Sequence, residues 1–448
     1  MLKQQKIFFE FLRFCISSES EIPSSLKEAD WKELYRIAQK QCLVGILFDG
    51  IQKLPPAEVG MSKDLLLQWM MQCQMLEKAN VRLNDAAIQV SEWFRKKGFR
   101  TCILKGQGNA LLYPNGLHRT PGDIDIWVEG GDKRVISFVR SISPHEKACY
   151  HHIEFPSYKG VEVEVHYRPS FLLCFWHDRK LQKYYERVKE EQFSHRVMLG
   201  EQGEIAIPTV EFNLIFQLTH IYAHLMNEGI GLRQLLDYYY VLCDFYKVYQ
   251  KSSNHPVNLS NHPVPLSKEG STFSPSPSSS GSGDVTALRC SEPLRYKDGG
   301  ASKPSPDCAG WDRLGMSGKM ASDCTGASFP VAIDRVQEEL KELGLWKFAG
   351  GIMYIMQEVF GMPASRLIVP PNEKYGRFVL NEVLEAGNFG KHDERNRFGR
   401  SKLGHNLQRV YRDMRLVRYF PAEAMSEPFF RVWHFFWRLR WDFTYRLR

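Results

Sequence analysis

Apolar positions in the first hundred residues recur at helical spacing. Between residues 7 and 92 they return every three to four positions, as in "WKELYRIAQKQCLVGILFDGIQKL". This i, i+3, i+4 pattern is typical of amphipathic helices. A second run, "SKDLLLQWMMQCQMLEKANVRLNDAAIQVSEWFRKKG", ends at Gly98 after three cations, which suit the last turn of a helix. We therefore predict an N-terminal helical region over residues 1–94.

After Gly98 the pattern changes to short runs that favour strands. "FRTCILKG" and "DIDIWV" are β-type runs, and "QGNALLY" and "DKRVISFVRSI" are short helical stretches. In "YHHIEFPSYKGVEVEVHYRP" two alternating runs flank a turn-like segment, which predicts a hairpin. Interleaved strands and helices predict an α+β fold, with a small mixed β-sheet and flanking helices, over residues 95–210.

Three further regions follow this predicted core. Residues 211–250 are strongly helical in pattern and are expected to pack on the core. Residues 251–330 are rich in Ser, Pro and Gly, and they contain few large apolar side chains to offset the entropy of ordering. We predict that this segment is a disordered insertion. Helical patterning resumes over residues 331–448, the predicted C-terminal helical region.

Composition and charge narrow the function classes. The chain has 448 residues, of which 43% are hydrophobic and 25% charged, values that are ordinary for a globular protein. Its formal charge of +8 suits anionic partners such as nucleotides, nucleic acid or a membrane surface. No apolar run approaches the roughly 20 residues that span a bilayer. Ten dispersed cysteines without a CxxC pair fit a reducing compartment, so we predict a cytoplasmic protein.

The segment "RTPGDIDIWV" places two acids on one side of an apolar strand. Successive strand side chains alternate, so Asp123 and Asp125 are expected to project together. Like charges this close repel unless a cation lies between them. In "GVEVEVHY" the same alternation puts Glu162, Glu164 and His166 on one face. A few carboxylates suffice for Mg²⁺, which prefers oxygen ligands, so the sequence predicts a site for Mg²⁺ or Mn²⁺.

Upstream of the acids, "LKGQGNALLY" predicts a turn between a strand and a helix. Backbone amides at such a turn approach phosphate closely, and the helix N-terminus favours negative charge. Lys105 and Arg119 add cations between that turn and the carboxylates. For Arg119, a salt bridge to Asp123 is an alternative that is compatible with a phosphate contact.

The arrangement "ILKG…R…DIDIWV…VEVH" resembles the nucleotidyltransferase superfamily of the DNA polymerase β type. Within it, the chain is similar to a bacterial branch with an LKG start and a VExH ending. Gln107 stands where the superfamily usually has Gly or Ser. The resemblance implies that three acids are catalytic and hold the metal, with Glu162 the rival of the third: Asp123, Asp125 and Glu164. It also implies four residues that bind the triphosphate: Lys105, Gly106, Gln107 and Arg119.

The resemblance covers roughly residues 95–245, and "EAGNFGKHDERN" looks like a late segment of the same branch. It implies possible substrate contacts in the strand and the helices that follow: Glu162, His166, His220, His224, Arg233 and Asp237. Alternatives remain open for the helical residues. His220 and His224 have the spacing of metal ligands or simply line a pocket. Arg233 and Asp237 contact substrate or pair with each other along a helix.

The predicted function is a metal-dependent nucleotidyltransferase. It moves a nucleoside monophosphate from an NTP such as ATP to an unidentified acceptor, a protein, an RNA or a small molecule, with Glu164 as general base. The alternative is a catalytically silent fold that binds nucleotides or proteins. The tail "FFRVWHFFWRLRWDFTYRLR" binds nucleic acid, lies on a membrane or packs as a terminal helix. Base preference and oligomeric state are left open by the sequence.

Overall fold

The computed structural model describes residues 3–17, 21–55, 59–201, 203–253, 329–395 and 402–446. The predicted disordered insertion over residues 251–330 lies outside the described residues, apart from its two edges. Those edges belong to helices, because α9 runs to Ser253 and α10 begins at Phe329.

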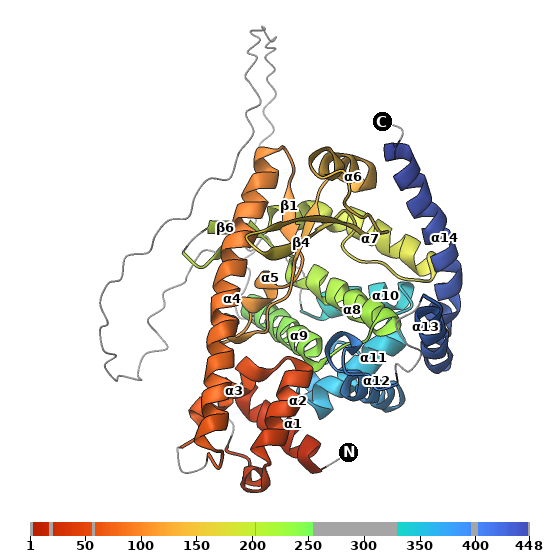
Figure 1. Cartoon of the computed structure of the whole chain (residues 1–448). Helices are drawn as coiled ribbons and strands as arrows, with labels where there is room; N and C mark the ends of the chain where they lie inside the picture. Colours follow the sequence, from red (N-terminus) through yellow and green to blue (C-terminus); the bar gives the residue numbers. More distant parts are fainter. Residues whose placement is uncertain are drawn as a thin grey trace, which may run out of the picture. The chain divides into compact units, whose positions relative to one another are not determined.

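The N-terminal region consists of helices, and polar side chains cap the second and the last of its α-helices. These helices are α1 (Lys3–Ile16), η1 (Ser24–Glu28), α2 (Trp31–Gln41), α3 (Val44–Lys53) and α4 (Lys63–Lys96). The side chain of Asp30 accepts from the backbone of Lys32 and Glu33, which caps α2. The long helix α4 contacts α3 near one end and β1 and β6 near the other (Figure 1). It ends where the sequence predicts, just before Gly98, which takes a φ of 80°.

A four-stranded mixed sheet follows α4. Its strands are β1 (Thr101–Ile103), β2 (Ile124–Val128), β3 (His152–Tyr158) and β4 (Val161–His166). The order is β1-β2-β4-β3, with β2 and β4 parallel and both other pairs antiparallel. The predicted hairpin is β3–β4, which turns at Lys159 and Gly160, both with positive φ. The predicted α+β fold is therefore confirmed.

Helices cover both faces of this sheet. The apolar residues of β2 and β4 pack with α4 and with α6 (Gly131–Ile142), the crossover helix between β2 and the hairpin. The opposite face carries Asp125, Trp127, Glu164 and His166. Trp127 packs there against Phe193 of α7 (Phe175–Ser194) and Phe212 of α8 (Val210–Asn227), at 4.7 and 5.9 Å between ring centroids. The polar side chains of the sheet thus face the α7–α8 layer.

The remaining elements complete the described structure. They are α5 (Gln107–Ala110), η3 (Gly116–His118), β5 (Arg196–Leu199), β6 (Gly203–Ala206), α9 (Leu232–Ser253), α10 (Phe329–Glu342), α11 (Trp346–Glu358), η4 (Ala364–Arg366), α12 (Glu373–Ala386), η5 (Asn388–Gly390), α13 (Lys402–Leu416) and α14 (Pro421–Arg446). The two-stranded β5–β6 sheet was not predicted. Helices α10 and α11 share one apolar core with α8 and α9. Among the described residues, no helix combines the length and hydropathy that a membrane crossing requires.

The aromatic–basic tail forms most of α14, which is packed on one side only. Phe430 contacts the rings of Phe171 and Tyr150 at 5.2 and 5.6 Å between centroids. On another side of the helix, Phe429 and Phe436 are exposed, Phe429 to 78%. The prediction of a packed terminal helix therefore holds for one face of the tail, while the face with Phe429 and Phe436 is exposed to solvent.

Candidate functional site: a carboxylate group on the mixed sheet

Three carboxylates meet beside the β2–β4 pair. The parallel register sets Asp125 directly beside Glu164. Asp123 begins the predicted strand, but in the structure it lies in the connecting loop, one residue before β2. One oxygen from each of the three lies within 4.8 Å of the others. Asp125 is buried, whereas Asp123 and Glu164 are half-buried. Glu162 is exposed and lies outside this group, so the structure brings Glu164 to the pair.

The ammonium of Lys105 contacts both aspartates, where the sequence predicts a divalent cation. Its Nζ lies 3.0 Å from Asp125 Oδ2 and 3.8 Å from Asp123 Oδ1. Burial alone would lower the pKa of Lys105, but Asp123 and Asp125 outweigh it and raise that pKa. The chain can turn sharply after Lys105 because Gly106 adopts a φ of 64°. Lys105 thus neutralises much of the charge that the aspartates bring together.

His166 forms the second positive contact of the carboxylates. Its Nε2 lies 3.0 Å from Asp125 Oδ1 and 3.4 Å from Glu164 Oε2. Burial opposes protonation, yet these two acids raise the pKa of His166 to about 9. Burial also disfavours ionised Asp125, but Lys105 and His166 hold its pKa below the usual value. For Glu164 burial is likewise overcome, by His166 and His152, so its pKa is lowered.

His152 belongs to the site but was missed in the sequence. Its Nδ1 lies 3.4 Å from Glu164 Oε2. In the β3–β4 hairpin His152 is paired directly with His166, and Glu154 with Glu164. The signal was available in "HHIEF", because aligning the two arms of the predicted hairpin places one of its histidines opposite the histidine of "VEVH".

The predicted histidines of α8 extend the site away from the sheet. Lys105 Nζ lies 3.3 Å from Nε2 of His220, whose pKa is far below the usual value because of burial and then of Lys105. A neutral His220 accepts a hydrogen bond from Lys105. His224 packs on His220 at 4.4 Å between ring centroids and places Nδ1 3.3 Å from Glu228. Within the described part of the chain, neither histidine joins a group of metal-ligand atoms.

Arg119 is engaged elsewhere than predicted. Its guanidinium donates to both oxygens of Asp237, at 2.7 and 2.8 Å, and the residue is only 2% exposed. The hydroxyl of Tyr113 donates to Asp237 as well, at 2.7 Å. The expected salt bridge from Arg119 to Asp123 is therefore wrong. Asp237 forms its direct ion pair with Arg119, and against the effect of burial the charge of Arg233 adds to that of Arg119 in lowering the pKa of Asp237. Arg233 donates to the backbone carbonyl of Thr120 at 3.5 Å. A phosphate contact by Arg119 would require its buried pair to open.

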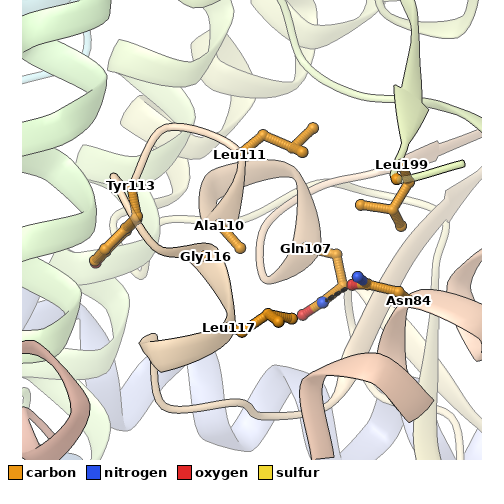
Figure 2. Close-up of a pocket in the computed structure, with 9 residues that line it drawn as sticks. Asn84, Gln107, Ala110, Leu111, Tyr113, Gly116, Leu117 and Leu199 are labelled. Atoms are coloured by element: carbon orange, nitrogen blue, oxygen red, sulfur yellow. Dashed lines mark hydrogen bonds between the residues drawn. The ribbon is translucent and has the colours of Figure 1, made fainter. Parts of the chain in front are cut away.

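Gln107 points into a separate cavity. Figure 2 shows its amide directed at Asn84, whose Oδ1 accepts a hydrogen bond from Gln107 Nε2. The cavity has a volume of about 230 Å³. It is lined by residues of α4, α5, the loop that follows α5, and the β5–β6 turn: Asn84, Gln107, Ala110, Leu111, Tyr113, Gly116, Leu117, Leu199 and Gly200. The carboxylates do not line it, so the side chain of Gln107 faces away from the predicted phosphate position.

Comparison with known proteins gives one match. Residues 27–249 match the model of a family described as "uncharacterised nucleotidyltransferase". This span includes the whole mixed sheet and helices α2 to α8, and with them the three carboxylates, Lys105 and the α8 histidines. No curated protein and no solved structure matches the chain.

Proposed function

We propose, from the membership of residues 27–249 in a nucleotidyltransferase family, that this protein transfers a nucleoside monophosphate from an NTP to an acceptor in a metal-dependent reaction. One observation carries the proposal. The parallel register of β2 and β4 sets Glu164 beside Asp125, and together with Asp123 these acids present a compact group of oxygen atoms. The acceptor is proposed only by class, as a protein, an RNA or a small molecule, and the location as cytoplasmic.

The donor set fits Mg²⁺ or Mn²⁺. Both cations favour carboxylate oxygen, and Mg²⁺ sites typically combine few carboxylates with water and substrate phosphates. Asp123, Asp125 and Glu164 would hold the cation. When bound, it supplies neutralisation of the charge on the transferring phosphoryl group.

The surrounding residues have distinct roles in this proposal. Lys105 lies beside the carboxylates and is placed to bind a triphosphate oxygen, and the backbone after Gly106 approaches the same anion. His166 fixes the orientation of Asp125 through its 3.0 Å contact. Glu164 stays ionised at neutral pH and accepts the proton of the acceptor hydroxyl as general base. The silent-fold alternative is not favoured, since a silent descendant is expected to have lost acids that are all present here.

Calorimetric titration tests the proposal directly. ATP, GTP, CTP and UTP are titrated into the full chain with and without Mg²⁺, beside an Asp123→Asn/Asp125→Asn variant and a Glu162→Gln control. We expect one or more of the triphosphates to bind only with the metal, to be lost in the double variant and to be kept in the control. If no triphosphate binds the unmodified protein at any Mg²⁺ concentration, the proposal fails.

A further inference from the structure

A second group of ligand atoms adjoins the carboxylates and contains nitrogen. His152, Glu164 and His166 each present one donor atom within 4.8 Å of the others. We propose that these three residues bind a second divalent cation, of the borderline-soft class to which Zn²⁺ belongs. Occupation of this position does not rest on the proposed function; any use of the cation in nucleotide transfer does.

The distances from Glu164 fit coordination of a cation, which would replace the present contacts of His152 Nδ1 with His151 Nε2 and of His166 Nε2 with Asp125, both at 3.0 Å. Glu164 Oε2 lies 3.4 Å from His152 Nδ1 and 3.4 Å from His166 Nε2. Charge-assisted hydrogen bonds between nitrogen and carboxylate are shorter, at about 2.7–2.9 Å. Around a tetrahedral zinc ion with bonds of about 2.0–2.1 Å, adjacent ligand atoms lie about 3.3 Å apart. Two edges of this group therefore already have the length that a tetrahedral cation requires.

A backbone carbonyl orients the imidazole ring of His166 in the way that is typical of metal-binding histidines. Its Nδ1 faces the carbonyl of Arg168 at 3.3 Å, and such a contact fixes the ring and leaves Nε2 for a cation. Nε2 also contacts Asp125 at 3.0 Å. On binding, the cation replaces the Nε2 proton, which leaves to solvent, and Asp125 keeps its ion pair with Lys105.

The neighbouring donors determine which cation is expected. His152 also belongs to a group with Cys149 and His151, whose ligand atoms lie within 4.8 Å of one another. Nitrogen and sulfur donors select Zn²⁺ over Mg²⁺, and two histidines with one glutamate form a known three-ligand zinc set with an open fourth place. On the other side of Glu164, Asp123 and Asp125 offer only oxygen. Glu164 would thus be shared by a hard and a softer cation.

Metal binding by the full chain, independent of activity, tests this inference. The protein is stripped with a chelator and titrated with Co²⁺, followed by visible absorption. Zn²⁺ content is then measured by elemental analysis in the presence of excess Mg²⁺. We expect one Zn²⁺ per chain that excess Mg²⁺ does not displace, and a tetrahedral Co²⁺ spectrum.

Matched variants locate the ion. His152→Ala is expected to weaken Zn²⁺ binding at least tenfold. Asp123→Asn is expected to lose Mg²⁺-dependent nucleotide binding and to keep the Zn²⁺, which separates failure of this inference from failure of the proposed function. His145→Ala, at an exposed histidine, is the surface control. His177→Ala examines the separate group of Cys174, His177 and Glu423. Absence of stoichiometric Zn²⁺, or Zn²⁺ binding that His152→Ala leaves unchanged, overturns the inference.

Discussion

Two buried charged clusters differ in how completely their groups are paired. In the first, Arg119 and Asp237 make two short hydrogen bonds, and Tyr113 adds a third to the same carboxylate. In the second, Asp123, Asp125 and Glu164 share two cationic neighbours, Lys105 and His166, at distances that range from 3.0 to 3.8 Å. The first cluster is closed by its own members, and the second has spare acceptor capacity.

The completeness of pairing distinguishes a structural cluster from a functional one better than burial does. Arg119, Asp125 and Asp237 are all nearly inaccessible. A buried ion pair needs its remaining hydrogen-bond capacity satisfied, and the Arg119 pair achieves this without a ligand. The carboxylate group retains oxygens that a divalent cation can use. Spare acceptor capacity on the carboxylate oxygens is therefore the feature by which this cluster differs from the Arg119 pair.

The largest effect is expected from opening the closed cluster. Asp237→Asn leaves the Arg119 guanidinium buried without its counter-charge, which should lower the free energy of unfolding by about 3–5 kcal/mol. Urea denaturation measures this change. The double variant Arg119→Met/Asp237→Leu removes both charges and should recover most of the loss. If Asp237→Asn lowered the free energy of unfolding by less than about 1 kcal/mol, the Arg119–Asp237 cluster would not be a structural ion pair.

Next in size is the effect of Asp125→Asn on the open cluster. Lys105 keeps Asp123 and His166 keeps Glu164 as counter-charges, but both lose their 3.0 Å contact with the buried Asp125. The free energy of unfolding should therefore fall by about 1–3 kcal/mol, less than in Asp237→Asn. Several kcal/mol of charge stabilisation are lost with the cation, so Mg²⁺-dependent nucleotide affinity should fall by about a hundredfold or more. Calorimetry and denaturation of the same preparation give both numbers. Unfolding of the variant would mean that this cluster, too, is structural.

A pH-dependent effect of about 1 kcal/mol is expected at a third cluster. His118 lies 2.5 Å from Asp49 and 2.9 Å from Glu77. Burial lowers the pKa of His118, but these acids outweigh it and raise the pKa above its ordinary value of 6.5. The stabilisation is complete below the unfolded-state pKa and is lost as pH rises through the raised folded-state pKa.

Between roughly pH 6 and pH 9 the free energy of unfolding should fall by about 1 kcal/mol more in the unmodified protein than in His118→Asn, because His166, whose pKa is raised to about 9, contributes to both. The magnitude stays near 1 kcal/mol because Glu77 is partly solvent-screened. An identical pH dependence in both proteins would show that His118 is not held in its charged form.

The smallest effect is expected at the neighbour of the open cluster. Glu162 is exposed on the same strand as Glu164 but outside the ligand group. Glu162→Gln should leave nucleotide affinity within about twofold and stability within about 0.5 kcal/mol. Glu164→Gln, assayed in parallel, should lose Mg²⁺-dependent binding. If both variants lost the same amount of Mg²⁺-dependent nucleotide binding, the position of Glu164 beside Asp125 would not be what makes it the third acid.

Local periodicity predicted the α+β fold and most of the carboxylate group. Alternation in "DIDIWV" and "VEVEVH" depends on neighbouring residues alone, so the faces of both strands could be assigned. The choice between Glu162 and Glu164 required the β2–β4 register, which is set by packing of residues far apart in the chain. The end of α4 just before Gly98 could also be predicted from a local signal, the three cations followed by glycine.

Long-range partners could not be predicted. Arg119 pairs with Asp237 on α9, although the two residues are far apart in sequence. No local pattern predicts that Asp237 pairs with Arg119 and not with Arg233, which lies one turn away on the same helix. Gln107 turns toward Asn84 because α4 passes beside α5. The position of Lys105 beside the aspartates likewise depends on the antiparallel pairing of β1 with β2, which continues in the hydrogen bond from Leu104 N–H to the carbonyl of Asp125. The predicted insertion over residues 251–330 lies mostly outside the described residues.

The ammonium of Lys105 competes with divalent cations for the oxygens of the two aspartates. A tethered charge acts at a high effective concentration, so a free divalent ion has to displace it before it can engage both aspartates. Triphosphate oxygens offer Lys105 another anion, and accepting them lowers the cost of that displacement. Metal and nucleotide are therefore expected to bind cooperatively, each tightening the other by the same factor. Lys105 would thus couple the arrival of the metal to the arrival of its substrate.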